Sequence, residues 1–140
     1  MAKFGREFVG ANLGTIATTS TTDVYVIAPI TGNISQALFS SLAALAAHDT
    51  NYITFSITNL GQAGAGTAAI LAATDANTTK ATGGTALAAN TKRTLTLTGT
   101  GTDRSVVAGD RLRIRATASG TLAGAVTASN VLLTIEDSLV

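Results

Sequence analysis

The strict alternation of residues 52–58 constrains the fold of this chain more than any other feature. Ile53, Phe55 and Ile57 occupy every second position, and less apolar residues separate them. A side-chain period of two is that of a β-strand with one buried face. Residues 93–98 and 111–116 repeat the pattern. We therefore predict that two-faced strands form the body of the protein.

Further short strands are expected along the rest of the chain. They are predicted at residues 23–28, 34–39, 67–73, 85–88 and 126–135, the last with a bend near Ser129. Gly- and Asn-rich turns separate them, a spacing typical of β-sandwiches and barrels. No run of long helices alternates with the strands, so a parallel α/β sheet is not expected. We predict an all-β, jelly-roll-like antiparallel β-sandwich of about eight strands.

Residues 35–47 allow two interpretations. Leu38, Leu42 and Leu45 are spaced as on one face of a helix, and the segment is rich in Ala. The alternative, which we favour, is a short strand followed by an Ala-rich loop with at most one helical turn.

The first 22 residues differ from the rest of the chain. They hold Phe4 and Phe8, two of its four phenylalanines, before the first convincing strand. We predict an extended N-terminal arm over residues 1–22 and a sandwich domain over residues 23–140. The arm either folds onto its own domain or docks on a neighbouring subunit. In the second case Phe4, Arg6 and Phe8 are candidate interface residues, and deleting the arm leaves the sandwich folded.

A second candidate interface lies on the strand predicted at residues 111–116. Its outward positions are Arg111, Arg113 and Arg115. Three cations on one strand face repel one another unless nearby acidic groups neutralise them. Either a neighbouring strand supplies those groups, for example Glu136 or Asp137, or the face binds another subunit. Arginine suits the second role because its planar fork binds carboxylates through two hydrogen bonds.

Side chains able to take part in catalysis or metal binding are scarce. The chain has no Cys and one His, His48, which we interpret as a turn residue because no Gly-x-Ser-x-Gly pattern accompanies it. Asp103 and Asp110 are interpreted as turn or ion-pair residues. A calcium site at Asp75 and Asn77 is left open. We predict no enzymatic activity, no catalytic residue, no cofactor and no metal-ligating residue.

Charge and hydropathy narrow the choice of partners. Charged residues make up 12% of the chain, about half of the usual ~25%. A net charge of +1 provides no basic footprint for nucleic acid. The sequence shows no signal-peptide pattern and no long apolar run. We expect neither nucleic acid nor a membrane as a partner.

The order of the central segments resembles that of a known class of proteins. Residues 49–59 lead into the Gly-rich stretch 61–67, which residues 77–84, 95–97 and 107–112 follow. This succession resembles the small β-sandwich capsid decoration proteins of tailed bacteriophages, also called cement or head-stabilising proteins. The resemblance covers roughly residues 23–135 and rests on turn and strand patterns.

The resemblance implies a structural virion protein that binds the outer surface of an assembled capsid and stabilises it. The implied partners are the major capsid protein and further copies of the chain, typically as a homotrimer. The implied location is the capsid surface, after synthesis in the host cytoplasm. The alternative is a carbohydrate- or receptor-binding module of a phage fibre or tail, for which Tyr25 and Tyr52 are the only aromatics beyond phenylalanine.

Overall fold

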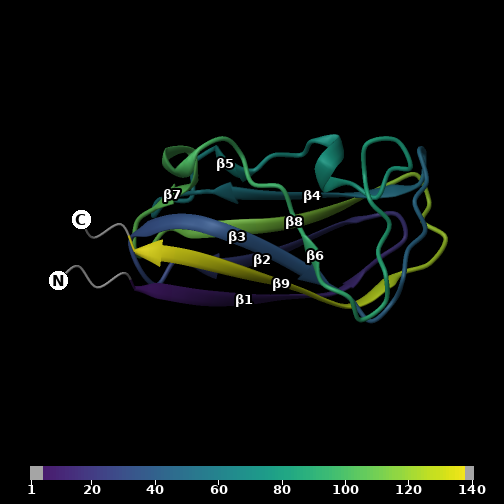
Figure 1. The fold of residues 1–140 in the computed structure, drawn as a ribbon, viewed down its shortest axis with the longest axis horizontal. Coiled ribbons are helices and arrows are strands. Elements are labelled where there is room, and N and C mark those ends of the chain that lie inside the picture. Colours follow the sequence, from purple (N-terminus) through teal and green to yellow (C-terminus); the bar gives the residue numbers. More distant parts are fainter. Residues whose placement is uncertain (1–4, 138–140) are drawn as a thin grey trace.

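The computed structural model describes residues 5–137, which form two antiparallel sheets packed face to face (Figure 1). The first sheet has the order β1 (Arg6–Ile16), β9 (Val126–Asp137), β3 (Gly32–Ser40) and β6 (Arg93–Thr94), and β7 (Ser105–Val106) also pairs with β3. The second has the order β2 (Thr21–Ile27), β8 (Arg111–Ser119), β4 (Tyr52–Asn59) and β5 (Ala68–Leu71). Two short 3₁₀ helices, η1 (Asp75–Asn77) and η2 (Gly101–Arg104), lie in connections.

The strand order is that of a jelly roll. The chain passes between the sheets at each step from β1 to β4, then from β5 to β6, and at each step from β7 to β9. β6 and β7 both pair with β3 and share the position of one strand. The predicted all-β antiparallel sandwich is confirmed.

The core lies between the two sheets and is built by the alternation seen in the sequence. Ile53, Phe55 and Ile57 of β4 are buried, and so are Leu112, Ile114 and Ala116 of β8. Phe39 of the first sheet meets Phe55 of the second, with ring centroids 4.6 Å apart. The two sheets are therefore joined by aromatic and aliphatic side chains from their inner faces.

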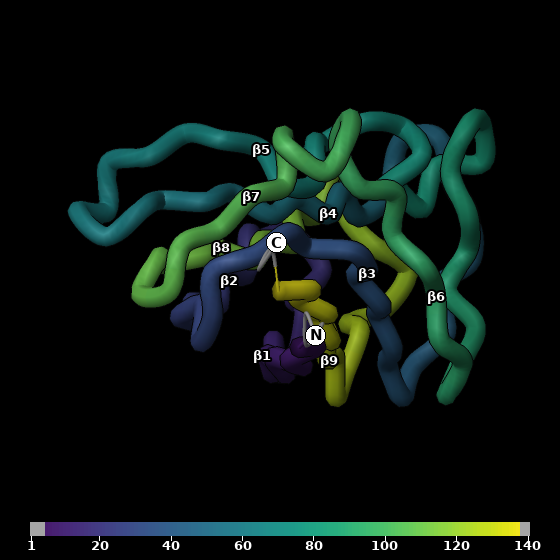
Figure 2. Tube along the Cα trace, turned by 60° about the vertical axis from the view of Figure 1, so that its left-hand side comes forward, coloured from purple at the N-terminus to yellow at the C-terminus, as the bar shows by residue number. Residues whose placement is uncertain are grey.

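β1 is the segment that the sequence assigned to an arm. Its residues pair with β9 from Arg6 opposite Glu136 to Ile16 opposite Val126, and Figure 2 shows the two strands side by side. Ile16 is buried in the shared core. The structure thus places the first strand of the sandwich at residues 6–16, on its own domain, rather than starting the sandwich at residue 23. Phe4 lies outside the described residues.

The segment at residues 35–47 is a strand followed by a loop. β3 ends at Ser40, and the loop is held by paired backbone hydrogen bonds between Leu45 and Leu87, of 2.9 and 3.0 Å. This confirms the favoured interpretation, and the described residues contain no α-helix. Among the same residues, no helix has the length and apolar character needed to cross a membrane.

The strand predicted at residues 93–98 is shorter than expected. Only Arg93 and Thr94 form β6, because the backbone then changes partners. The Leu95 N–H donates to Ala37 of the first sheet and the Thr98 N–H to Ile70 of the second, each at 2.9 Å. The segment therefore crosses from one sheet to the other.

Candidate interaction surface

The three outward arginines of β8 lie on the outer face of the second sheet. β2 and β4 flank them: Arg111 is opposite Ile27, and Arg113 lies between Tyr25 and Thr58. We call this surface the arginine face; it comprises Asp23, Tyr25, Ile27, Ser56, Thr58, Arg111, Arg113 and Arg115. It exists because β8 alternates between core and outward positions while β2 and β4 pair with it in register.

Arg115 is neutralised within the chain. Its Nε and Nη2 donate to the two carboxylate oxygens of Asp23, each at 2.7 Å. These hydrogen bonds are the main cause that lowers the pKa of Asp23 below its usual value. The sequence had suggested Glu136 or Asp137 as the acidic partner. Both lie on β9 in the other sheet, and Glu136 pairs with Arg6 at 2.7 Å.

Arg111 contacts an aromatic ring instead of an acid. Its guanidinium carbon lies 4.2 Å from the centroid of the Tyr25 ring, a distance typical of a cation–π contact. Tyr25 is still 44% exposed. The pair therefore presents a charge and an aromatic surface together at the outside of the sheet.

Arg113 is the least satisfied of the three. Its Nη2 lies 3.5 Å from Thr58 Oγ1, a long contact, and its Nε is buried with no hydrogen-bond partner. A buried donor left unsatisfied costs about 1–3 kcal/mol. Among the described residues, neither Arg113 nor Arg111 takes part in an ion pair. The arginine face thus carries two cations that form no ion pair with an acid of the described chain.

The Asp23–Arg115 pair should make stability depend on pH. Because the folded-state pKa of Asp23 is lowered, the pair adds stability above the usual carboxyl range, and that stability is lost as pH falls through the folded-state pKa. We expect Asp23→Asn to cost about 1 kcal/mol at pH 7, since both side chains are partly exposed. Urea unfolding at pH 7 and near pH 3 checks this: the gap between the two proteins should shrink in acid, and a gap of constant size would contradict the assignment.

The remaining predicted interface residues lie on the other side of the sandwich. Arg6 and Phe8 are on β1, at the outer face of the first sheet, and Phe8 is 60% exposed. They do not converge with the arginine face. Phe4 falls outside the described residues.

Arg93 is a structurally important residue that the sequence did not reveal. Its guanidinium donates to the carbonyl oxygens of Thr85 at 2.8 Å, Ala76 at 3.0 Å and Thr78 at 2.7 Å. It also lies 5.7 Å from the centroid of the Phe55 ring, and burial lowers its pKa. One side chain thus holds the loop after β5 against the core. The role of Arg93 follows only from the three-dimensional positions of these carbonyl groups, which the sequence does not show.

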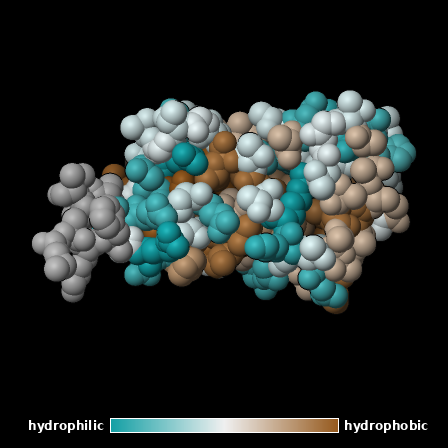
Figure 3. All heavy atoms as spheres, in the orientation of Figure 1, coloured by the Kyte–Doolittle hydropathy of each residue, from teal (hydrophilic) through white to brown (hydrophobic). Residues whose placement is uncertain are grey.

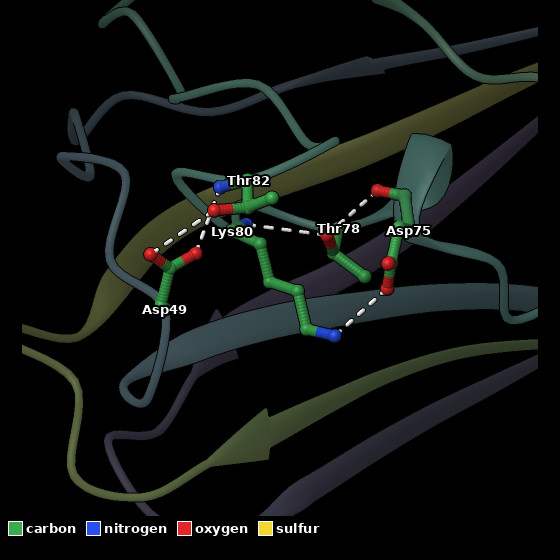
Figure 4. A network of polar contacts seen from close by, with 5 residues as sticks. All are labelled: Asp49, Asp75, Thr78, Lys80 and Thr82. Atoms are coloured by element: carbon green, nitrogen blue, oxygen red, sulfur yellow. Dashed lines mark hydrogen bonds and ion pairs between the residues drawn. The ribbon is translucent and has the colours of Figure 1, made fainter.

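The same loop is fixed by a polar network drawn in Figure 4. Asp49 accepts a 2.7 Å hydrogen bond from the Thr82 N–H, and Lys80 Nζ lies 2.8 Å from Asp75 Oδ1. Thr78 Oγ1 donates to the Asp75 carbonyl at 2.7 Å. The network therefore ties residues 75–82 to the turn before β4.

The other polar residues weighed in the sequence have structural partners. The Asn77 amide bonds to the carbonyls of Ala72 and Thr96 at 3.0 and 2.8 Å. His48 Nδ1 accepts backbone hydrogen bonds at 3.1 Å from the two residues that follow Asp49. Within residues 5–137, no three His, Asp or Glu side chains are grouped closely enough to hold a metal ion.

Comparison with known proteins finds similarity in fold only. No protein-family model and no curated protein matches the chain. A structure of dimeric latent PorU from Porphyromonas gingivalis matches 98% of the chain at 12% identity and a TM-score of 0.50. A structure of the Gx strain of infectious bursal disease virus matches 93% of the chain at 11% identity and a TM-score of 0.41. A structure of the Gt strain matches 96% of the chain at 15% identity and a TM-score of 0.33.

The chain spans only a part of each of these proteins. It covers 13% of the PorU chain and 32% and 31% of the two viral chains. At such identities the likeness to PorU shows the sandwich fold and nothing about activity.

Proposed function

We propose that this chain is a non-enzymatic structural protein that binds the outer surface of a tailed-phage capsid and uses the arginine face as its contact. The observation that carries the proposal is the pair Arg111 and Arg113, two cations on an outer sheet face with no ion pair in the described chain. A guanidinium binds a carboxylate through two parallel hydrogen bonds. The matching partner is a capsid surface that presents Asp or Glu side chains.

Two further arguments support a capsid as the partner. The segments between residues 23 and 135 resemble capsid decoration proteins, and jelly rolls occur in viral capsids as well as in lectins and cupins. Copies arranged on a capsid, as the homotrimer implied by that resemblance would be, gain avidity even if each contact is weak. The fold by itself does not choose among these functions.

Co-sedimentation with purified tailed-phage heads tests the proposal, with electron microscopy of heads with and without the protein. Arg111→Ser and Arg113→Ser should each weaken binding about tenfold, or about 1.4 kcal/mol, and flatten its salt dependence. Lys92→Ser is the matched control, because it removes one exposed positive charge outside the arginine face. Absence of binding to heads, or equal losses for the lysine and arginine variants, would overturn the proposal.

A second function is favoured by one observation on the same surface. Tyr25 is 44% exposed and lies opposite Arg113 in the sheet. An exposed aromatic ring beside an arginine suits a sugar ring, which stacks on the aromatic and accepts hydrogen bonds. A glycan array probed with the wild type and with Tyr25→Ser distinguishes the two: glycan binding that this substitution abolishes would favour the fibre or tail module.

A further inference from the structure

β1 is an edge strand with one unpaired side. Within residues 5–137, β9 is the only strand that pairs with it. The Gly5 carbonyl accepts a 2.8 Å hydrogen bond from the Asp137 N–H, so the odd-numbered residues direct their backbone groups toward β9. The register is unbroken from Arg6 to Asn12. Because backbone groups alternate along a strand, the even-numbered residues direct theirs away from β9, toward any strand that is added.

The outer face of β1 has an apolar hollow beside an exposed aromatic residue. Gly10, Leu38 and Leu132 are among the residues that line a hollow of about 390 Å³, and a Cβ atom placed on Gly10 would meet nothing within 4 Å. Phe8 lies two residues from Gly10, on the same outer face, and is 60% exposed. On the face that Figure 3 draws, brown apolar residues reach the surface between hydrophilic ones.

We propose that two copies of the chain pair antiparallel through β1, about a two-fold axis at Val9, so that Phe8 of each copy lies over Gly10 of the other. This register makes Phe8 and Gly10 a hydrogen-bonded pair, as the direction of their backbone groups requires. An aromatic side chain that covers a glycine on the neighbouring strand stabilises such edges. The first sheets of the two copies then form one continuous sheet.

Asn12 also lines the hollow, so it is the bare backbone of Gly10 that selects this register from those that the backbone allows. A shift by one pair in one direction sets Phe8 opposite Phe8, and a shift in the other sets it opposite Asn12. In either case no aromatic covers Gly10. The chosen register also opposes no like charges, because Arg6 meets Asn12 and Glu7 meets Ala11 of the second copy. The pairing is isologous and does not depend on capsid binding.

Native mass measured by light scattering across a concentration series tests the pairing. Phe8→Ser removes the inserted side chain, while Gly10→Val fills the hollow from its own strand, at a position where a Cβ atom meets nothing within 4 Å in the single copy. We expect the wild-type particle to have twice the mass of either variant, with all three proteins folded by circular dichroism. Equal masses for the three, whether the wild type never associates or the variants still do, would overturn the proposal.

The register can be tested separately because the chain has no cysteine. Val9 of the two copies would form a non-hydrogen-bonded pair with Cα atoms about 4.5 Å apart, within the disulfide range of about 4.4–6.8 Å. Under mild oxidation Val9→Cys should give a covalent dimer at least tenfold faster than Glu7→Cys, whose residue would face Ala11. Equal rates would rule out the pairing at Val9.

Discussion

Deletion of residues 1–20 is expected to abolish folding. The deletion removes β1 and with it every pair that β1 forms with β9. It also removes the buried side chains of Leu13 and Ile16, each worth about 1.5–3 kcal/mol on full burial. The core facing that edge would then be open to water. Because a domain of this kind is stable by only about 5–15 kcal/mol, we expect loss of the strand signal in circular dichroism and of cooperative urea unfolding.

A shorter deletion provides the control. Removal of residues 2–4 ends before β1 and leaves every pair between β1 and β9 in place, so this protein should keep its strand signal and its cooperative urea unfolding. The two deletions separate an arm from a strand, since an arm over residues 1–22 could be removed without unfolding the sandwich. A cooperative transition in the longer deletion would contradict the role given to β1.

Arg93→Met is expected to destabilise the protein by about 3 kcal/mol. The guanidinium donates to three carbonyl oxygens, those of Ala76, Thr78 and Thr85, and a hydrogen bond from a charged group contributes about 1.5–3 kcal/mol. Methionine keeps the bulk against Phe55 and removes every donor. The expected loss is smaller than the sum of the three hydrogen-bond contributions, because water can reach some of the freed carbonyl oxygens. Urea unfolding measures the change.

Two substitutions calibrate this result. Lys92→Met removes a positive charge from the neighbouring, exposed position and should change stability by less than about 0.5 kcal/mol. Arg93→Lys retains the charge, but a single ammonium cannot reproduce the planar fork, so it should recover little of the loss. An Arg93→Met protein as stable as the Lys92→Met protein would show that the three hydrogen bonds are dispensable.

The strands that the sequence predicts best are those with one face in the core and the other outside. β4 and β8 are of this kind: Ile53, Phe55 and Ile57 are buried, as are Leu112 and Ile114. Such strands can be predicted from the alternation alone, without knowing which strands they pair with.

β1 shows why the same reasoning has limits. Gly10 and Gly14 carry no side chain to continue the pattern, and register shifts follow Asn12 and Gly14. Its largest apolar side chain, Phe8, points outward. The segment is a strand because β9 lies beside it, and a sequence read locally does not contain that neighbour.

The candidate surface was predictable in part for the same reason. The shared face of Arg111, Arg113 and Arg115 follows from alternation within β8 alone. The partner of Arg115 does not, because Asp23 is 92 residues away in the chain and its position depends on the order of the strands. Arg93 lacks a sequence signal altogether, since its partners are backbone carbonyls.

The pairing of β1 with β9 also affects when the protein can fold. Arg6 and Glu136 are 130 residues apart in the chain, so the first sheet cannot close while a ribosome is still making the last strand. Until then the backbone of β1 has no strand to pair with, and its apolar side chains stay exposed. Contacts of such long range slow folding and expose unpaired strands to other nascent chains. For this jelly roll, synthesis of the final strand sets the earliest moment of folding.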